Sequence, residues 1–554
     1  MAAGEGHEPA EEGKDAGHRG GGSEKYSPSC LTICLIGVGI LLVLHLCWLG
    51  SLSNRVSSEM DAIRAAGYPT SLSELDRWYK QPEGKNAADI YKKAFRALSD
   101  PERDNRKKLP MAGNAALPPP EEPIPPDMEA AIREYLNSND RALELLHDAA
   151  EIDGCRYPVN LAQGFGVLLP HLQDLRDGVR LLSLRAALAA HRDQPDIATK
   201  ALLSAFAVGR SLKNEPLLIS ELVRIGCDAI VLASLESTLA RTELRSRHLS
   251  ALREALEKCE MPDRLQQVFI AERAFGVGAF QRGTQLCRFR PGPAGGPWLT
   301  PLNHVYRISG VAYLDELAYL DTMETMIDAA GRPWPERMRA FKAGAGTPGG
   351  FGGNSWIYPV THQILPGYTR AAKSAVRHAA KLRAARAALA VAGYQLEHGE
   401  LPEELDALTP GTLEQVPRDP ADGKQIRLIR KDDLWRFYSI GPDGKDDGGT
   451  AKDQEDVVFD LHLPPPLTAG GCAREPSMPA SPESRIPALH AANKEEWRRE
   501  SEAQLLLRVT PCFDVSYADY YGLTTHAAAR SMLRCNAIDH VLGSSSKMRH
   551  CKFR

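Results

Sequence analysis

The chain has few aromatic residues and no excess of either charge. Phe, Trp and Tyr make up 6% of its 554 residues, and 67 basic side chains stand against 71 acidic ones. A protein that binds nucleic acid over much of its surface needs an excess of basic residues, so the balanced charge argues against that class. Scarce aromatics together with abundant Ala, Leu and Arg favour helices packed on helices.

The short motifs that mark common catalytic and metal sites are also missing from this sequence. Its eleven cysteines include no Cys-x-x-Cys pair, which argues against a zinc ribbon and a thioredoxin-like site. No His-Glu-x-x-His and no nucleophile elbow occurs. The Gly-rich stretch 343–353 contains Pro348 and lacks the Gly-Lys-Ser/Thr of a phosphate loop, so we interpret it as a surface loop.

Isolated charges on apolar helical stretches remain as candidates for catalysis. Glu272 and Arg273 lie in Ala-Glu-Arg-Ala-Phe, and Asp315 and Glu316 lie in a similar setting. A buried Glu can act as a general base. An ion pair that packs two helices explains the same pattern, and we favour that interpretation.

One long apolar run is present, between Cys30 and Gly50, and it contains no charged residue. About 20 apolar residues span a bilayer as a helix. The polar leader at 1–29 is long for a signal peptide, and no Ala-x-Ala site follows the run. We therefore predict an uncleaved single-pass anchor at 30–50 after a disordered tail at 1–29.

The basic residues on the two sides of the run indicate an orientation. Lys14, Arg19 and Lys25 precede it, and Arg55 and Arg64 follow it. Because basic residues concentrate on the cytoplasmic side, this bias predicts a cytoplasmic N-terminus and an extracytoplasmic bulk of the chain.

The middle of the chain carries a helical pattern. Apolar side chains recur at three- or four-residue steps, as in Leu172, Leu175, Val179, Leu182 and Ala186. Turns such as Gln194-Pro195-Asp196 separate one helix from the next. We predict an α-hairpin stack over 127–342, with an irregular bundle as the alternative. A mixed membrane-proximal segment (51–108) and a Pro-rich linker (109–126) precede it, and a Gly-rich loop (343–366) follows.

The region 367–463 reads as a small α+β module. A long helix ends near Gly399, a short Pro-initiated helix follows, and Val416-Pro417-Arg418-Asp419-Pro420 leads into a strand pair and an acidic loop. The predicted fold class is therefore mainly α with a small α+β module that contains an antiparallel sheet. The last segment, 464–554, is predicted to be an irregular tail, and no function is assigned to it.

The acidic loop is the best candidate site in the sequence. Aspartates 443, 446, 447, 453 and 456 alternate with several glycines. Calcium takes six to eight hard oxygen ligands from a chain that bends tightly, which aspartates and glycines provide. An EF-hand is excluded because Lys445 occupies its third position and no Glu occupies its twelfth. A solvated Asp-Gly turn is the alternative.

The order of elements in 367–463 resembles the globular part of the major pseudopilins of type II secretion. That resemblance implies calcium held by Ser439, nearby backbone carbonyls and chiefly Asp447, Asp453 and Asp456. The full set of candidate ligands is Ser439, Asp443, Asp446, Asp447, Asp453 and Asp456. The chain departs from the family because its apolar run lacks the Gly-Phe-Thr-Leu-x-Glu cleavage motif and residues 51–366 separate that run from the module. We therefore do not expect it to polymerise as a pilus subunit, and we interpret the unit as a stability or docking module.

The whole chain resembles a group of membrane-anchored envelope proteins of planctomycete-type bacteria. The resemblance rests on the anchor and on segments 68–72, 215–220 and 224–227. It implies an architecture but no activity, and we predict that the chain lies in the bacterial inner membrane. We predict a non-catalytic bitopic scaffold or interaction protein that binds the membrane and an envelope protein partner, and not nucleic acid. The alternative is an envelope hydrolase with a site between the helical domain and the Gly-rich loop.

Overall fold

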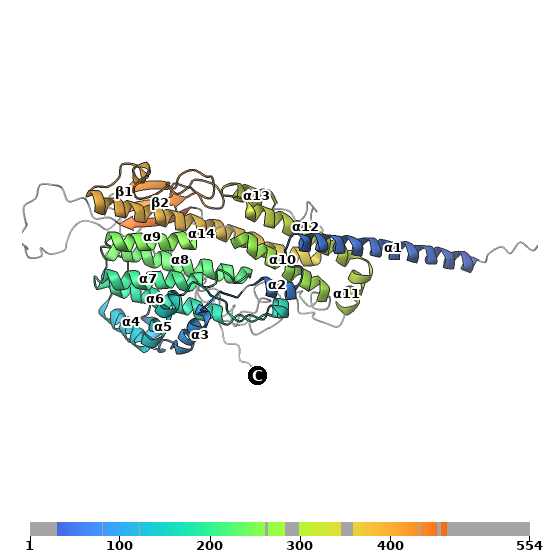
Figure 1. The fold of residues 1–554 in the computed structure, drawn as a ribbon, viewed down its shortest axis with the longest axis horizontal. Coiled ribbons are helices and arrows are strands. Elements are labelled where there is room, and N and C mark those ends of the chain that lie inside the picture. Colours follow the sequence, from blue (N-terminus) through green and yellow to red (C-terminus); the bar gives the residue numbers. More distant parts are fainter. Residues whose placement is uncertain are drawn as a thin grey trace, which may run out of the picture. The chain divides into compact units, whose positions relative to one another are not determined.

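A computed structural model describes residues 30–79, 81–120, 122–260, 264–282, 299–344, 358–431, 434–450 and 456–462. Its contacts divide the chain into two units, Met1–Asn54 and Arg55–Arg554. The described part is mainly helical and contains one small antiparallel sheet, as the fold class predicted (Figure 1). The predicted tails at 1–29 and 464–554, and residues 345–357 of the predicted Gly-rich loop, lie outside the described residues.

Helix α1 (Cys30–Ala65) contains the predicted anchor. Within the described residues it is the one helix long and apolar enough to cross a membrane. Its apolar side chains between Leu31 and Trp48 are 41–70% exposed, a state that water would disfavour and lipid would not. The helix continues beyond the predicted anchor at 30–50 as far as Ala65. No Gly or Pro occurs between residues 51 and 65, and the helix ends before Gly67, whose φ of 82° favours glycine.

Thirteen further helices occur in the described part of the second unit. They are α2 (Leu72–Trp78), α3 (Ala87–Ala97), α4 (Pro126–Ser138), α5 (Asp140–Ala150), α6 (His171–His191), α7 (Pro195–Arg210), α8 (Leu218–Arg241), α9 (Ser246–Cys259), α10 (Arg264–Arg282), α11 (Leu299–Ile308), α12 (Val311–Gly331), α13 (Glu336–Gly344) and α14 (Pro359–His398). Helices α6 to α9 lie beside one another, and α14 packs along α8 and α9 (Figure 1). The central helices therefore pack on one another, with α6 in contact with both α7 and α8.

The second unit has one main core. The larger of two clusters of buried apolar side chains extends from Val56 to Leu461 and includes residues on both sides of positions 109–126, 343 and 367. The Pro-rich segment contributes to this core through Leu109, Leu117 and Ile124. Arg241 of α8 donates from Nη2 to the carbonyl oxygens of Pro118 and Pro119 at 2.7 and 2.9 Å. The Pro-rich segment is therefore a strap that packs against the rest of the core. Its sequence alone does not show this, because its partner Arg241 lies more than 100 residues further along the chain.

The described part of the unit also contains three strands: β1 (Arg427–Lys431), β2 (Leu434–Ser439) and β3 (Val457–His462). They form an antiparallel sheet in the order β1-β2-β3. Alternate side chains, Trp435 and Phe437 on β2 and Phe459 and Leu461 on β3, are buried, and both strands contact α14. The period-two alternation of strands explains why one face of the sheet joins the core.

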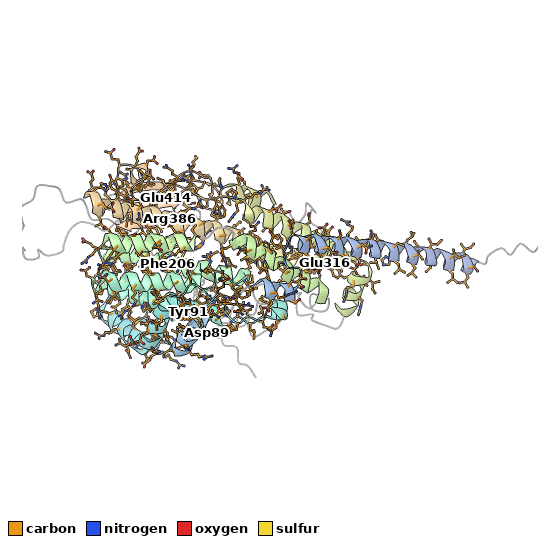
Figure 2. All side chains as sticks on the ribbon, in the orientation of Figure 1. Asp89, Tyr91, Phe206, Glu316, Arg386 and Glu414 are labelled. Carbon is orange, nitrogen blue, oxygen red and sulfur yellow. The ribbon has the colours of Figure 1, made fainter. Side chains whose placement is uncertain are left out.

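Helix α14 starts at Pro359, before the predicted 367, and it ends at Gly399, whose φ is 76°. Its basic side chains pair with acids of the neighbouring helices. Lys381 Nζ lies 2.8 Å from Glu236 of α8, and Arg386 lies within 3.0 Å of Glu257 on α9 and of Glu260, which follows α9. Figure 2 shows Arg386 on α14. These ion pairs fix the long helix on the stack and so position the sheet.

Candidate functional site

The acidic loop lies between β2 and β3 in the sequence, and among its described residues Gly449 packs against side chains of β1 and β2. Gly449 in this loop has a φ of 72°, and a Cβ there would lie 2.9 Å from Ile429 Cδ1 of β1. Its carbonyl oxygen accepts a hydrogen bond from Arg436 Nη1 at 3.0 Å. Only glycine allows this close approach in this conformation, because it lacks a side chain.

Three of the predicted ligands are already used within the protein. The Ser439 hydroxyl is buried, donates to Asp419 Oδ1 at 2.7 Å and accepts the Gly441 amide at 3.1 Å. Asp446 accepts hydrogen bonds from Arg427 Nε at 3.0 Å and from the Tyr438 hydroxyl at 3.2 Å. Asp443 is exposed, and its carboxylate accepts the amide of Lys445 at 3.1 Å. These three side chains shape the loop.

Asp447 and Asp456 are different. Asp447 Oδ2 and Asp456 Oδ1 are buried and have no hydrogen-bond partner among the described residues. The second oxygen of Asp456 accepts the Gly449 amide at 2.7 Å and the Thr450 amide at 3.3 Å. The Thr450 hydroxyl donates to the Asp447 carbonyl oxygen at 2.8 Å, so both aspartates contact the same turn. Burial raises the pKa of Asp456.

The donor set fits calcium better than a softer metal. A buried carboxylate oxygen without a partner is unfavourable, and a hard cation would supply one. Asp453, the third aspartate of the predicted site, lies outside the described residues. Among those that are described, no group of three or more His, Cys, Asp or Glu side chains gathers around a metal position. Backbone carbonyls would have to complete the coordination.

Asp419 and Arg427 anchor the loop, and the sequence did not reveal these roles. The Asp419 carboxylate is fully buried and accepts hydrogen bonds from Ser439 Oγ, the Ile440 amide at 3.0 Å and Arg427 Nη1 at 2.7 Å. Arg427 also lies 3.0 Å from Asp446. Asp419 belongs to the Val416–Pro420 motif, but its partners lie up to 21 residues away, so no local pattern indicates them.

Glu272, the candidate general base, caps a helix. It is fully buried, accepts the Leu218 amide at the start of α8 at 2.9 Å, and accepts the Tyr368 hydroxyl at 3.4 Å. Arg273 forms a 2.6 Å ion pair with Glu324 of α12. These contacts agree with the helix-packing interpretation of the Ala-Glu-Arg-Ala-Phe stretch.

A second cluster joins α8 to α9 and α14. Arg224 pairs with Glu221 at 2.6 Å and with Asp228 at 3.2 Å, and Asp228 lies 2.9 Å from His378 Nε2. Arg224 also donates to the carbonyl oxygen of Cys259 at 3.3 Å. Burial raises the pKa of the Cys259 thiol well above its usual range, so this Cys, Asp and His set lacks a reactive thiolate.

Asp315 and Glu316 of α12 have separate roles. Asp315 accepts the amides of Val360 and Thr361 at 3.0 and 3.2 Å, so it caps the start of α14. The Tyr306 hydroxyl of α11 donates to the same carboxylate at 2.7 Å. Glu316, which is labelled in Figure 2, is buried. Burial together with the adjacent Asp315 raises its pKa to about 7.

The elements of the predicted module occur in the predicted order. The long helix ends at Gly399, a 3₁₀ turn at Leu405–Leu408 takes the place of the short Pro-initiated helix, and the antiparallel strands and the loop follow. The chain matches no protein-family model, no curated protein and no solved structure. The resemblance to the pseudopilin head stays a prediction.

Proposed function

We propose that this chain is a non-catalytic single-pass protein of the bacterial inner membrane, with its N-terminus in the cytoplasm. Its second unit would act outside the cytoplasm as a scaffold or interaction module in secretion or envelope assembly. The observation that supports this proposal is that buried ionisable groups of the unit contact other parts of the helical framework. Glu272 and Asp315 bind helix N-termini, and Arg224 joins acids within the helical stack. Such groups hold a rigid framework together.

Calcium at the acidic loop is part of the proposal. Asp447 and Asp456 would supply the carboxylate oxygens, supported by the buried oxygen that each leaves without a partner among the described residues. A bound divalent cation would neutralise these two charges and tie the loop to β3. The ion would thus stabilise the module in a compartment where calcium is millimolar.

We expect calcium to raise the melting temperature of the full chain in detergent micelles. At 100 times the dissociation constant, binding to the folded state alone adds about 2.7 kcal/mol. Asp456→Asn should abolish the shift, whereas Asp443→Asn, in the same loop but exposed, should retain it. The measurement is thermal unfolding with calcium and then with chelator. An unchanged melting temperature in the folded wild type would contradict the calcium proposal.

The topology and the lack of catalysis are tested separately. Protease added to intact spheroplasts should digest the unit after α1 and leave a tag at the N-terminus protected. A cytoplasmic second unit would resist digestion and contradict the location. The purified chain should turn over no substrate in a panel of esters, peptides and glycosides. Turnover that disappears in Glu272→Gln would instead support the hydrolase alternative.

A further inference from the structure

One buried arginine between α10 and α12 uses only part of its guanidinium. Arg273 of α10 is 2% exposed, and its Nη1 donates to Glu324 Oε2 of α12 at 2.6 Å. Its Nε and Nη2 atoms are buried and have no hydrogen-bond partner among the described residues. A buried charged donor without an acceptor is unfavourable, so an acceptor at these two atoms would stabilise the fold.

The two unpartnered atoms of Arg273, here called the open edge, lie on one side of the planar guanidinium. The N–H bonds of Nε and Nη2 on that side run parallel, and their spacing matches the two oxygens of a carboxylate. A water molecule has one oxygen and no charge, so it matches the open edge less well.

Other arginines of this chain fill the same edge with a carboxylate. Arg436 donates from Nε and Nη2 to the two carboxylate oxygens of Asp460 at 2.8 and 2.7 Å. Arg224, which is also buried, donates from the same two atoms to Glu221 at 2.9 and 2.6 Å. A carboxylate is therefore the acceptor expected at the open edge of Arg273.

The acid already at Nη1 of Arg273 does not exclude a second one. In Arg224, Nη1 donates to Asp228 at 3.2 Å while Glu221 occupies Nε and Nη2. Arg273 has the first kind of partner and lacks the second. Because the Glu324 side chain is 58% exposed, water screens its charge. A carboxylate with one charge suits the open edge better than a phosphate with two, which Glu324 would repel more strongly.

Tyr68 is the partly exposed residue next to the guanidinium. The Arg273 Cζ atom lies 5.8 Å from the centre of the Tyr68 ring, and Tyr68 is 38% exposed. Helices α10 and α12 pack against each other (Figure 1). The open edge is itself buried, so access to it favours a small acid over a side chain on the surface of a folded partner.

We propose that the open edge of Arg273 is a binding site for the carboxylate of a small organic acid. The acid would accept two parallel hydrogen bonds from Nε and Nη2, while Glu324 stays at Nη1. This inference goes beyond the scaffold role, because it gives the chain a ligand site that is separate from the acidic loop and its cation.

The test uses the full chain in detergent micelles at neutral pH, with sodium acetate as the probe and sodium chloride at equal ionic strength as the reference. Saturation-transfer NMR of the acetate methyl group measures binding. Arg273→Lys keeps the charge and loses the paired donors, so it should bind acetate at least about tenfold more weakly. Arg192→Lys is the matched control, because Glu129 already accepts from Nε and Nη2 of Arg192. It should bind acetate as the wild type does.

Glu324→Gln provides a second variant that does not depend on the folding of Arg273→Lys. Glu324 is largely exposed, so its substitution should leave the fold intact. It removes a negative charge close to the open edge and should strengthen acetate binding about two- to fivefold. Unchanged or weaker binding by this variant would contradict the site.

Other results would also overturn the proposal. Equal binding by wild type and Arg273→Lys would place acetate elsewhere on the chain, and no binding by the wild type would leave the open edge to water. Tighter binding of the peptide acetyl-Gly-Glu-Gly-amide than of acetate would assign the edge to a protein carboxylate instead of a small acid. None of these results alters the calcium, protease or turnover tests, so failure of this site is distinguishable from failure of the proposed function.

Discussion

Arg224→Met is expected to lower the free energy of unfolding by about 3–5 kcal/mol, because it leaves buried acids without their cation. Arg224 is 5% exposed, and its guanidinium binds both carboxylate oxygens of Glu221 at 2.6 and 2.9 Å. It also lies 3.2 Å from Asp228, which is fully buried. Denaturant unfolding of the full chain in micelles, followed by circular dichroism, measures the loss.

Two controls separate charge from packing. Arg141→Met breaks an exposed ion pair with Glu144 and should change stability by less than about 0.5 kcal/mol. The triple variant Glu221→Gln, Arg224→Met, Asp228→Asn removes the uncompensated charges together. It should recover at least half of the loss. If the triple variant is as unstable as Arg224→Met alone, the instability comes from lost packing and the charge explanation is wrong.

Glu316→Gln should stabilise the protein at pH 8 by about 3 kcal/mol and have little effect at pH 4. Burial and then the charge of Asp315 raise the pKa of Glu316 from 4.5 to about 7. Below pH 4.5 the carboxyl is protonated in both the folded and the unfolded chain, so it adds no penalty. Between pH 4.5 and 7 only the unfolded chain ionises, and stability falls as the pH rises. Above pH 7 the penalty is complete.

The measurement is the unfolding free energy of both proteins from pH 4 to pH 8. Glu397→Gln serves as the control because Glu397 is exposed near the end of α14. It should leave the pH dependence of the wild type unchanged. A difference between wild type and Glu316→Gln that stays constant across this range would show that Glu316 does not titrate as its burial requires.

Contacts with β1 fix the acidic loop to the sheet without any bound ion. Arg427 of β1 pairs with Asp446 of the loop and with Asp419, and Asp419 also holds Ser439 at the end of β2. The loop thus has protein anchors on one side and the buried Asp447 and Asp456 oxygens on the other. We expect chelation to lower stability without unfolding the sheet.

Local signals in the sequence were sufficient for several features. The uncharged run from Cys30 to Gly50 predicts the apolar helix because length and hydrophobicity alone qualify a segment to cross a membrane. The three- and four-residue apolar spacing predicts the central helices, and Gly399 marks the end of the longest one. The aspartates and glycines clustered between Gly441 and Asp456 predict a loop after β2. Each of these depends on interactions between residues close together in the chain.

Only the tertiary structure decided how these pieces meet. It joins the Pro-rich strap to the main core through Leu117 and Ile124, brings Asp419 to Ser439, and leaves Asp447 and Asp456 with unpaired oxygens within the described part of the chain. It also closes the edge of β3 with Glu236 and Lys381 from distant helices. Burial and pairing of a polar group depend on residues distant in the chain; the Asp460 amide and its partner Glu236 are 224 positions apart. Sequence periodicity reports which face of an element is apolar, and only packing determines which partner covers it.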